Sequence, residues 1–208
     1  MVQPSGFYLP NRIARYFFLV MLDIMGQGGL NTLLHVAKLE QYIGEPPPDT
    51  LEKAFDFASM AALNIALEET YGTLGGRGMA LRIGRASFSQ GMKSFGALAG
   101  MNDPLFRALP SDEACRVGLQ ALTHVFNTFT DQRCSFEQTP DSYRFIVENS
   151  CVAWNRQSSK PVCHALAGIV QECVRWATNG REHYVVESAC RACGDERCVF
   201  DVSRMPMG

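Results

Sequence analysis

The chain has no excess of basic residues. Its 208 residues include 19 lysines and arginines against 21 acidic residues, which gives a net charge of −2. Proteins that hold nucleic acid through its phosphates need clustered positive charge, so we expect no nucleic-acid partner. Charged residues make up only 19% of the chain and hydrophobic residues 47%. This balance excludes a disordered chain and supplies a domain core.

Long apolar runs, leader features and glycosylation sequons are also lacking. The apolar segment at residues 16–22 is far shorter than the roughly 20 residues that cross a bilayer, and Asp23 interrupts it. No small-residue cleavage site follows it, and no Asn-x-Ser/Thr sequence occurs. These absences predict a cytoplasmic protein without a transmembrane segment. Its eight cysteines are then metal ligands or buried thiols rather than disulfides.

Motifs for nucleotide binding and catalysis are missing as well. No Lys-Ser/Thr follows the glycine cluster at residues 72–78, and a Gly-x-Gly-x-x-Gly pattern started at Gly76 fails at Leu81. We interpret the cluster as a turn into a helix that approaches a neighbour closely. No Ser/His/Asp or Cys/His motif is recognisable around the four histidines, which are His35, His124, His164 and His183. The sequence therefore favours a binding protein over an enzyme.

Helical patterns fill the first two-thirds of the chain. Apolar periodicity, capping residues and the breakers Gly28, Gly29 and Pro46 to Pro48 divide this part into segments. Helices are expected at about 12–25, 31–39, 49–71, from the glycine cluster to 95, and 111–128. In the fourth of these, Arg77, Arg82 and Arg85 form either a solvated face or a partner for a ligand carboxylate.

The final third changes character. Alternating residues at 133–137 and 142–148, with a turn between them, predict an antiparallel hairpin. A helix at 161–177 and strands at 183–188 and 199–202 follow. The order β-β-α-β-β after a helical front predicts an α+β fold in one domain, residues 1–208. Its helical part, 11–129, packs on the small antiparallel sheet of 130–203.

Four candidate metal ligands lie in the last helix and hairpin: Cys163, Glu187, Cys190 and Cys198. Thiolates suit zinc because they are soft and anionic, and zinc also accepts a carboxylate oxygen. The hairpin itself can bring Cys190 and Cys198 together, while Cys163 opens the preceding helix, where the helix dipole favours a thiolate. Such a closed site has a structural role and leaves no open position for catalysis.

The same cysteines permit other interpretations. They also fit ordinary buried thiols, and Cys190 with Cys193 forms a Cys-x-x-Cys pair typical of redox dithiols. Cys151 or Cys193 could replace Glu187 as the fourth ligand, and an iron–sulfur cluster could replace zinc. The remaining cysteines, Cys115, Cys134 and Cys173, are expected to be core thiols.

Two stretches resemble a known family. Residues 161–168 (PVCHALAG) and 187–200 (ESACRACGDERCVF) are together similar to the signature of the 4-vinyl reductase domain family. The resemblance extends upstream through 76–78 and 93–96. It implies the fold of TRAPP vesicle-tethering subunits and of bacterial sensor domains that detect phenol and toluene-like compounds. That fold is an antiparallel sheet with helices packed on it, commonly dimeric, around an apolar pocket.

The resemblance also implies a metal site. In the sensor members a zinc ion is held by a cysteine at the start of the helix, a glutamate and two hairpin cysteines. These roles match Cys163, Glu187, Cys190 and Cys198. The interval from helix to glutamate is one residue longer here, which makes Cys151 the first replacement for Glu187.

Thirteen phenylalanines and nine methionines either fill a core or line a pocket for a flat apolar ligand. The pocket candidates are Phe88, Phe95, Phe126, Tyr143, Phe145 and Trp176. We therefore expect a protein that binds an apolar or tetrapyrrole-like molecule and acts as a sensor, a carrier or an accessory factor in photosynthetic assembly or biosynthesis. One alternative is a vinyl reductase of (bacterio)chlorophyll synthesis that uses an external electron donor. The other is a ligand-free scaffold, dimeric with itself or with a related subunit.

Overall fold

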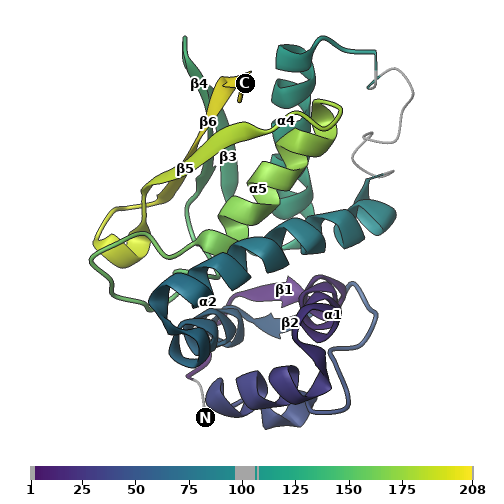
Figure 1. Ribbon diagram of the computed structural model, residues 1–208, viewed down its shortest axis with the longest axis vertical. Coiled ribbons are helices and arrows are strands. Elements are labelled where there is room, and N and C mark those ends of the chain that lie inside the picture. Colours follow the sequence, from purple (N-terminus) through teal and green to yellow (C-terminus); the bar gives the residue numbers. More distant parts are fainter. Residues whose placement is uncertain (1–2, 97–105, 107, 208) are drawn as a thin grey trace.

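A four-stranded antiparallel sheet organises the C-terminal half of the protein. The computed structural model describes residues 3–96, 106 and 108–207 (Figure 1). The strands are β3 (Cys134–Gln138), β4 (Ser142–Val147), β5 (His183–Ala189) and β6 (Cys198–Pro206), in the order β3-β4-β6-β5. The predicted hairpin, the final two strands and the α+β class are confirmed.

Helices cover one face of this sheet and continue into a second helical layer. Helices α4 (Ser111–Phe129) and α5 (His164–Ala177) lie on the sheet, and α2 (Phe57–Phe95) crosses α5 (Figure 1). Helix α1 (Asn11–Val36) packs on the far side of α2. The helical front and the sheet part therefore meet through α2.

A two-stranded sheet replaces the start of the third expected helix. Residues 53–56 were expected to be helical, but β2 (Lys53–Asp56) is a strand that pairs with β1 (Tyr8–Pro10). Phe55 is fully buried there, so packing against the core overrides the local helical signal. The true cap of α2 is Asp56, whose side chain accepts a hydrogen bond from the Ala58 amide at 2.7 Å.

Two long helices are broken at glycines. Helix α1 breaks at Gly26 (φ 71°, ψ 173°) rather than at the expected Gly28 and Gly29, and α2 breaks at Gly72 (φ 72°, ψ 164°). Both backbones are in conformations that side chains disfavour. The chain folds back so tightly after Gly72 that a Cβ on Gly76 would lie 2.5 Å from the Glu68 Cα. The close approach predicted from the glycine cluster is confirmed.

Helix α1 is long and apolar enough to cross a membrane when judged by length and composition alone. In the structure it is divided at Gly26 and contributes core residues such as Phe18, Met21 and Leu33. About 39% of its most apolar window is buried inside the protein. Core helices of globular proteins share these properties.

The crossing of α2 and α5 depends on two facing glycines. A Cβ on Gly84 would lie 2.0 Å from the Ala165 carbonyl oxygen, and a Cβ on Gly168 would lie 2.1 Å from the Leu81 carbonyl oxygen. Both distances are far below van der Waals contact. The absence of these two Cβ atoms therefore allows the helix backbones to touch, and this contact fixes the position of the first turn of α5.

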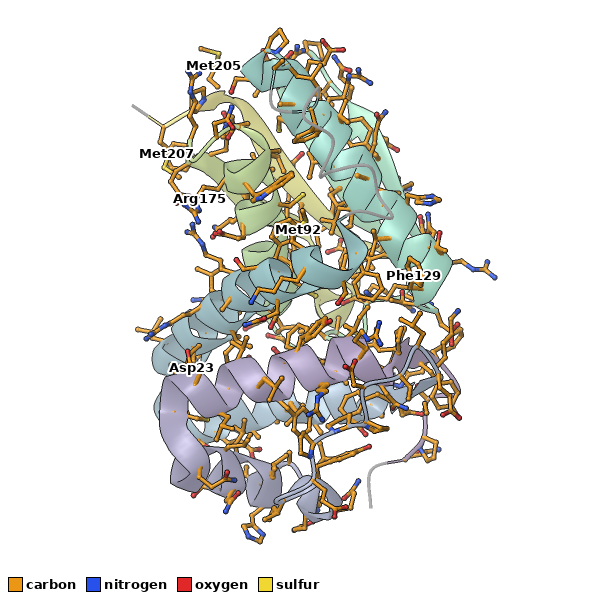
Figure 2. The ribbon with its side chains drawn as sticks, turned by 90° about the vertical axis from the view of Figure 1, so that its right-hand side faces the viewer. Asp23, Met92, Phe129, Arg175, Met205 and Met207 are labelled. Carbon is orange, nitrogen blue, oxygen red and sulfur yellow. The ribbon has the colours of Figure 1, made fainter. Side chains whose placement is uncertain are left out.

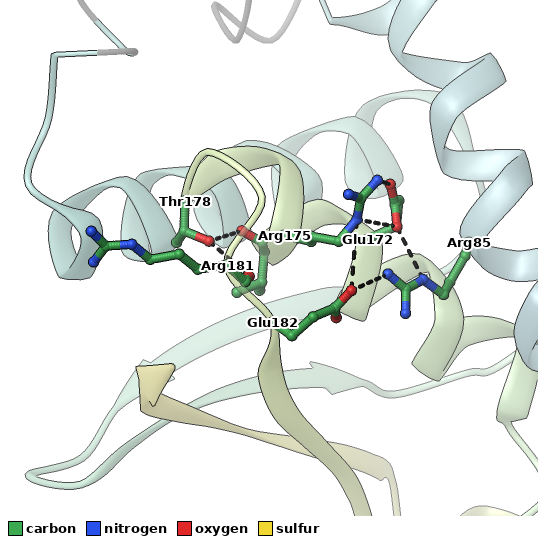
Figure 3. A network of polar contacts seen from close by, with 7 residues as sticks. Arg85, Glu172, Arg175, Thr178, Arg181 and Glu182 are labelled. Atoms are coloured by element: carbon green, nitrogen blue, oxygen red, sulfur yellow. Dashed lines mark hydrogen bonds and ion pairs between the residues drawn. The ribbon is translucent and has the colours of Figure 1, made fainter. Parts of the chain in front are cut away.

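An ion-pair network closes the same crossing (Figure 3). The buried carboxylate of Glu172 accepts hydrogen bonds from Arg85 at 3.0 Å and from Arg175, and Arg85 also binds Glu182 at 2.7 Å. Arg85 therefore joins α2 to α5 and to the loop before β5. Of the two roles expected for the arginine series, Arg85 has neither, because its charge is already matched by carboxylates of this chain.

Candidate functional site

Four side chains converge where α5 begins and the β5–β6 hairpin turns. Cys163 is the N-cap residue of α5, Glu187 lies on β5, Cys190 directly follows that strand, and Cys198 begins β6. One ligand atom from each lies within 4.8 Å of all the others. The local hairpin brings three of them together, and the packing of α5 on the sheet adds Cys163.

The geometry fits one tetrahedral metal ion. The Cys163 and Cys198 sulfurs are 3.5 Å apart, close to the roughly 3.8 Å expected for two sulfurs bound 2.3 Å from the same zinc. All three cysteines have 0% exposure. One Glu187 oxygen accepts a hydrogen bond from the Cys163 amide at 2.8 Å, while the other, Oε1, is buried without a partner. Buried polar atoms without partners are rare, and a metal ion would satisfy this one.

Backbone donors and a hydroxyl surround the sulfurs. The Arg191 amide donates to the Cys198 sulfur at 3.4 Å, and the Ser150 hydroxyl lies 3.3 Å from the Cys163 sulfur. Asp195 accepts a hydrogen bond from the Cys190 amide at 2.7 Å and holds the loop that contains η2 (Arg191–Cys193). Hydrogen bonds of this kind orient ligands and stabilise thiolate charge.

The electrostatics of the cluster call for a cation. Burial raises the pKa of the Cys163 thiol well above its ordinary value and raises the pKa of Glu187 to about 8. Hydrogen bonds from the Cys163 and Cys198 thiols instead lower the pKa of Cys190, so the metal-free cluster concentrates its negative charge there. A divalent ion would remove the repulsion, and binding would release protons from the remaining groups.

The two alternative ligands lie outside this group of four. Cys151 is buried, and burial raises its thiol pKa to about 12. Cys193 is exposed in η2. Neither is part of the cluster whose ligand atoms converge in the described residues. The three expected core thiols, Cys115, Cys134 and Cys173, are all buried.

An apolar cavity lies between four helices on the other side of α5. It has a volume of about 70 Å³ and is lined from α1, α2, α4 and α5. Three of the expected pocket residues, Phe88, Phe95 and Phe126, line it. Met92, labelled in Figure 2, lines it near the C-terminal end of α2.

The other three expected pocket residues do not line this cavity. Tyr143 donates its hydroxyl to Asp112 at 2.7 Å, and the Arg204 guanidinium lies over its ring. Phe145 fills the core beside Phe126, and Trp176 stacks on a phenylalanine ring away from the cavity. The sheet contributes no lining residue, because α4 and α5 separate it from the cavity.

The cavity also contains polar groups that the sequence analysis missed. Ser87 lines it, is only 5% exposed, and has a hydroxyl without a hydrogen-bond partner. The Tyr16 hydroxyl, on α1, instead bonds to the Ser94 hydroxyl. A helix position reading Ala-Ser-Phe carries no sequence signal for this role, because its orientation depends on how α2 packs.

The family model covers the part of the chain that holds the four-residue cluster. Residues 144–204 match the model of the 4-vinyl reductase domain. The chain contains a 4-vinyl reductase domain. The family expected from the sequence motifs is thereby confirmed for this segment, which includes Glu187, Cys190 and Cys198 as well as Cys163. The comparison with curated proteins finds no match.

Solved structures extend the comparison from the 4-vinyl reductase domain to the whole fold. The Fe(II) unliganded H-NOX protein from K. algicida shares 14% identity at a TM-score of 0.58, covering 96% of this chain and 97% of that chain. An H-NOX protein from S. oneidensis in the Fe(II)NO ligation state shares 10% identity at the same TM-score, covering 93% and 99%. At these identities the likeness establishes a shared fold, which the sequence analysis did not anticipate.

Proposed function

We propose that this protein, with its 4-vinyl reductase domain, binds a small apolar molecule in the cavity between α1, α2, α4 and α5. The observation that carries the proposal is the lining, which consists almost entirely of apolar and aromatic side chains around a single unpartnered hydroxyl. Ligand sites in proteins combine apolar walls with a few polar groups in this way. A role as a cytoplasmic sensor or carrier, acting through a dimer partner, follows as part of the proposal.

The size of the cavity narrows the ligand class. Its 70 Å³ is about half the ~150 Å³ of an engineered cavity that binds benzene. A single ring would enter if Met92 changed rotamer, since methionine side chains adapt easily. A tetrapyrrole would require the helices themselves to separate. Cavity size therefore favours a small hydrocarbon over a tetrapyrrole.

We further propose that Cys163, Glu187, Cys190 and Cys198 hold one zinc ion. Ligand atoms within 4.8 Å of one another suit a single ion better than an iron–sulfur cluster, whose ligands bind separate irons. Zinc would supply a cross-link between α5 and the hairpin and would balance the thiolate charge. The same helix α5 contributes Ile169 to the cavity, so the metal would fix one wall of the binding site.

A cavity-filling substitution tests the ligand proposal. Gly91 lines the cavity on α2, and a Cβ there would meet no atom within 4 Å. Gly91→Leu should therefore occupy the space without breaking the fold. Gly78→Leu is the matched control, because Gly78 has the same freedom on the same helix away from the cavity.

Calorimetric titration with toluene gives the readout. The proposal expects saturable binding by the unmodified protein and by Gly78→Leu, and at least about tenfold weaker binding by Gly91→Leu. Native mass spectrometry of material from the host should show an apolar ligand lost from the same variant. Equal binding by both variants, or no binding by the unmodified protein, would contradict the proposal.

A further inference from the structure

Two adjoining hollows lie beside the metal-site loop, on the opposite side of α5 from the apolar cavity. Their volumes are about 460 and 700 Å³, and they share Asn155, Arg156 and Arg191 as lining residues. One reaches Ser150, which touches the Cys163 sulfur, and the other reaches Cys193. We call the two together the loop hollow.

The charge of the loop hollow is of one sign. Arg156 and Arg191 are its only charged lining residues among those described, and no acidic side chain lines it. The chain as a whole has a net charge of −2, so an entirely positive lining is a local feature. Neutral hydrogen-bonding side chains complete the walls, among them Asn155, Gln157, Ser158 and Ser159.

Arg156 is held in place but only partly satisfied. Its side chain is 9% exposed, and its Nη2 donates to Glu68 at 2.7 Å. Its Nη1 is buried and has no hydrogen-bond partner. A fixed guanidinium with one arm engaged by the protein and the other free retains donors for a second acceptor.

Arg191 supplies a second charge that no carboxylate neutralises. Its Nη1 donates to the Glu148 backbone carbonyl at 2.8 Å, and it forms no ion pair within the described part of the chain. Its own amide binds the Cys198 sulfur, so the metal-site loop fixes its backbone. The two arginines thus come from separate loops that the fold holds against the same space.

We propose that the loop hollow binds the carboxylate or phosphate group of a small molecule between Arg156 and Arg191. Guanidinium groups form charge-assisted hydrogen bonds to both kinds of oxyanion. The free Nη1 of Arg156 is the primary donor, and the hydroxyl and amide side chains of the walls supply neutral hydrogen bonds. This site is separate from the apolar cavity, so it does not depend on the function proposed above.

Calorimetric titration of the metal-loaded protein tests the site, with inorganic phosphate in one arm and succinate in the other. Saturable binding of either anion is expected, and the stronger arm identifies the chemistry. Arg191→Gln and Arg156→Gln should each weaken it by about tenfold or more. Arg82→Gln, which removes an exposed arginine of α2 outside the hollow, should change it less than about twofold.

Two results would overturn the proposal. One is the absence of saturable binding for both anions. The other is equal weakening by Arg191→Gln and Arg82→Gln, which would reduce the effect to general charge attraction. Arg156→Gln also loses its bond to Glu68, so thermal melting checks its fold, and the exposed Arg191 variant decides the outcome if that variant unfolds.

Discussion

The glycine contact between α2 and α5 gives the sharpest prediction on stability. In Gly84→Ala the new Cβ would lie 2.0 Å from the Ala165 carbonyl oxygen and 2.8 Å from its carbonyl carbon. Backbone atoms cannot rotate away as a side chain can, so the helices must separate by more than about 1 Å. Overpacking of this kind typically costs about 1–3 kcal/mol, and a clash with backbone lies at the upper end.

The helical gain from replacing glycine by alanine offsets only part of that cost. It amounts to about 0.5–1 kcal/mol, so Gly84→Ala should lower the free energy of unfolding by at least about 2 kcal/mol. For a chain of this length the melting temperature should fall by at least about 4 °C. Gly78→Ala is the matched control on the same helix, because its Cβ would meet no atom within 4 Å, and it should be neutral or stabilising.

Thermal and denaturant unfolding of the two variants measure the difference, and chelator competition measures metal affinity in parallel. Gly84→Ala should also weaken metal binding, since the displaced helix begins one residue after Cys163. A melting temperature for Gly84→Ala equal to that of Gly78→Ala would refute the argument that backbone contact at this crossing positions the metal site.

Three other substitutions test the remaining interactions. Burial opposes ionisation of Glu172, but hydrogen bonds from Arg175 and Arg85 lower its pKa below the usual 4.5, so its stabilising contribution is complete above that value and is lost as pH falls through the folded pKa. The melting-temperature difference between the unmodified protein and Glu172→Gln should therefore shrink between pH 7 and strongly acidic pH, and a constant difference would contradict this. Cys198→Ser should abolish stoichiometric zinc binding while Cys151→Ser, equally buried but outside the cluster, retains it; loss in both would point to unfolding instead. Asp56→Ala should lower the free energy of unfolding by about 0.5–2 kcal/mol through the lost cap of α2, and an unchanged denaturant midpoint would exclude that role.

The order of elements in the sheet part could be predicted because its signals are local. Alternation in residues 134–147 and the Asn179-Gly180 helix end are visible in short windows. Cys190 and Cys198 could be paired for the same reason, as the two ends of one hairpin turn. The position of Cys163 beside them depends on how α5 packs on the sheet, and sequence reached it only through the resemblance of its motif.

The misassigned features depend on tertiary contacts. Phe55 lies in a strand because β1 and the core accept it, although its neighbourhood has helical periodicity. The breaks at Gly26 and Gly72 could not be distinguished from neighbouring glycines by sequence, since each is selected by a fold-back between helices. Tyr143 looked like a pocket aromatic, but its phenol serves Asp112, which lies 31 positions earlier in the chain.

X-ray absorption spectroscopy at the zinc edge, on protein purified without added chelator, tests the metal centre most directly. The account predicts one zinc per chain with three sulfur ligands at about 2.3 Å and one oxygen ligand at about 2.0–2.2 Å. Protein that holds no stoichiometric metal, or a metal bound by fewer than three sulfurs, would contradict it.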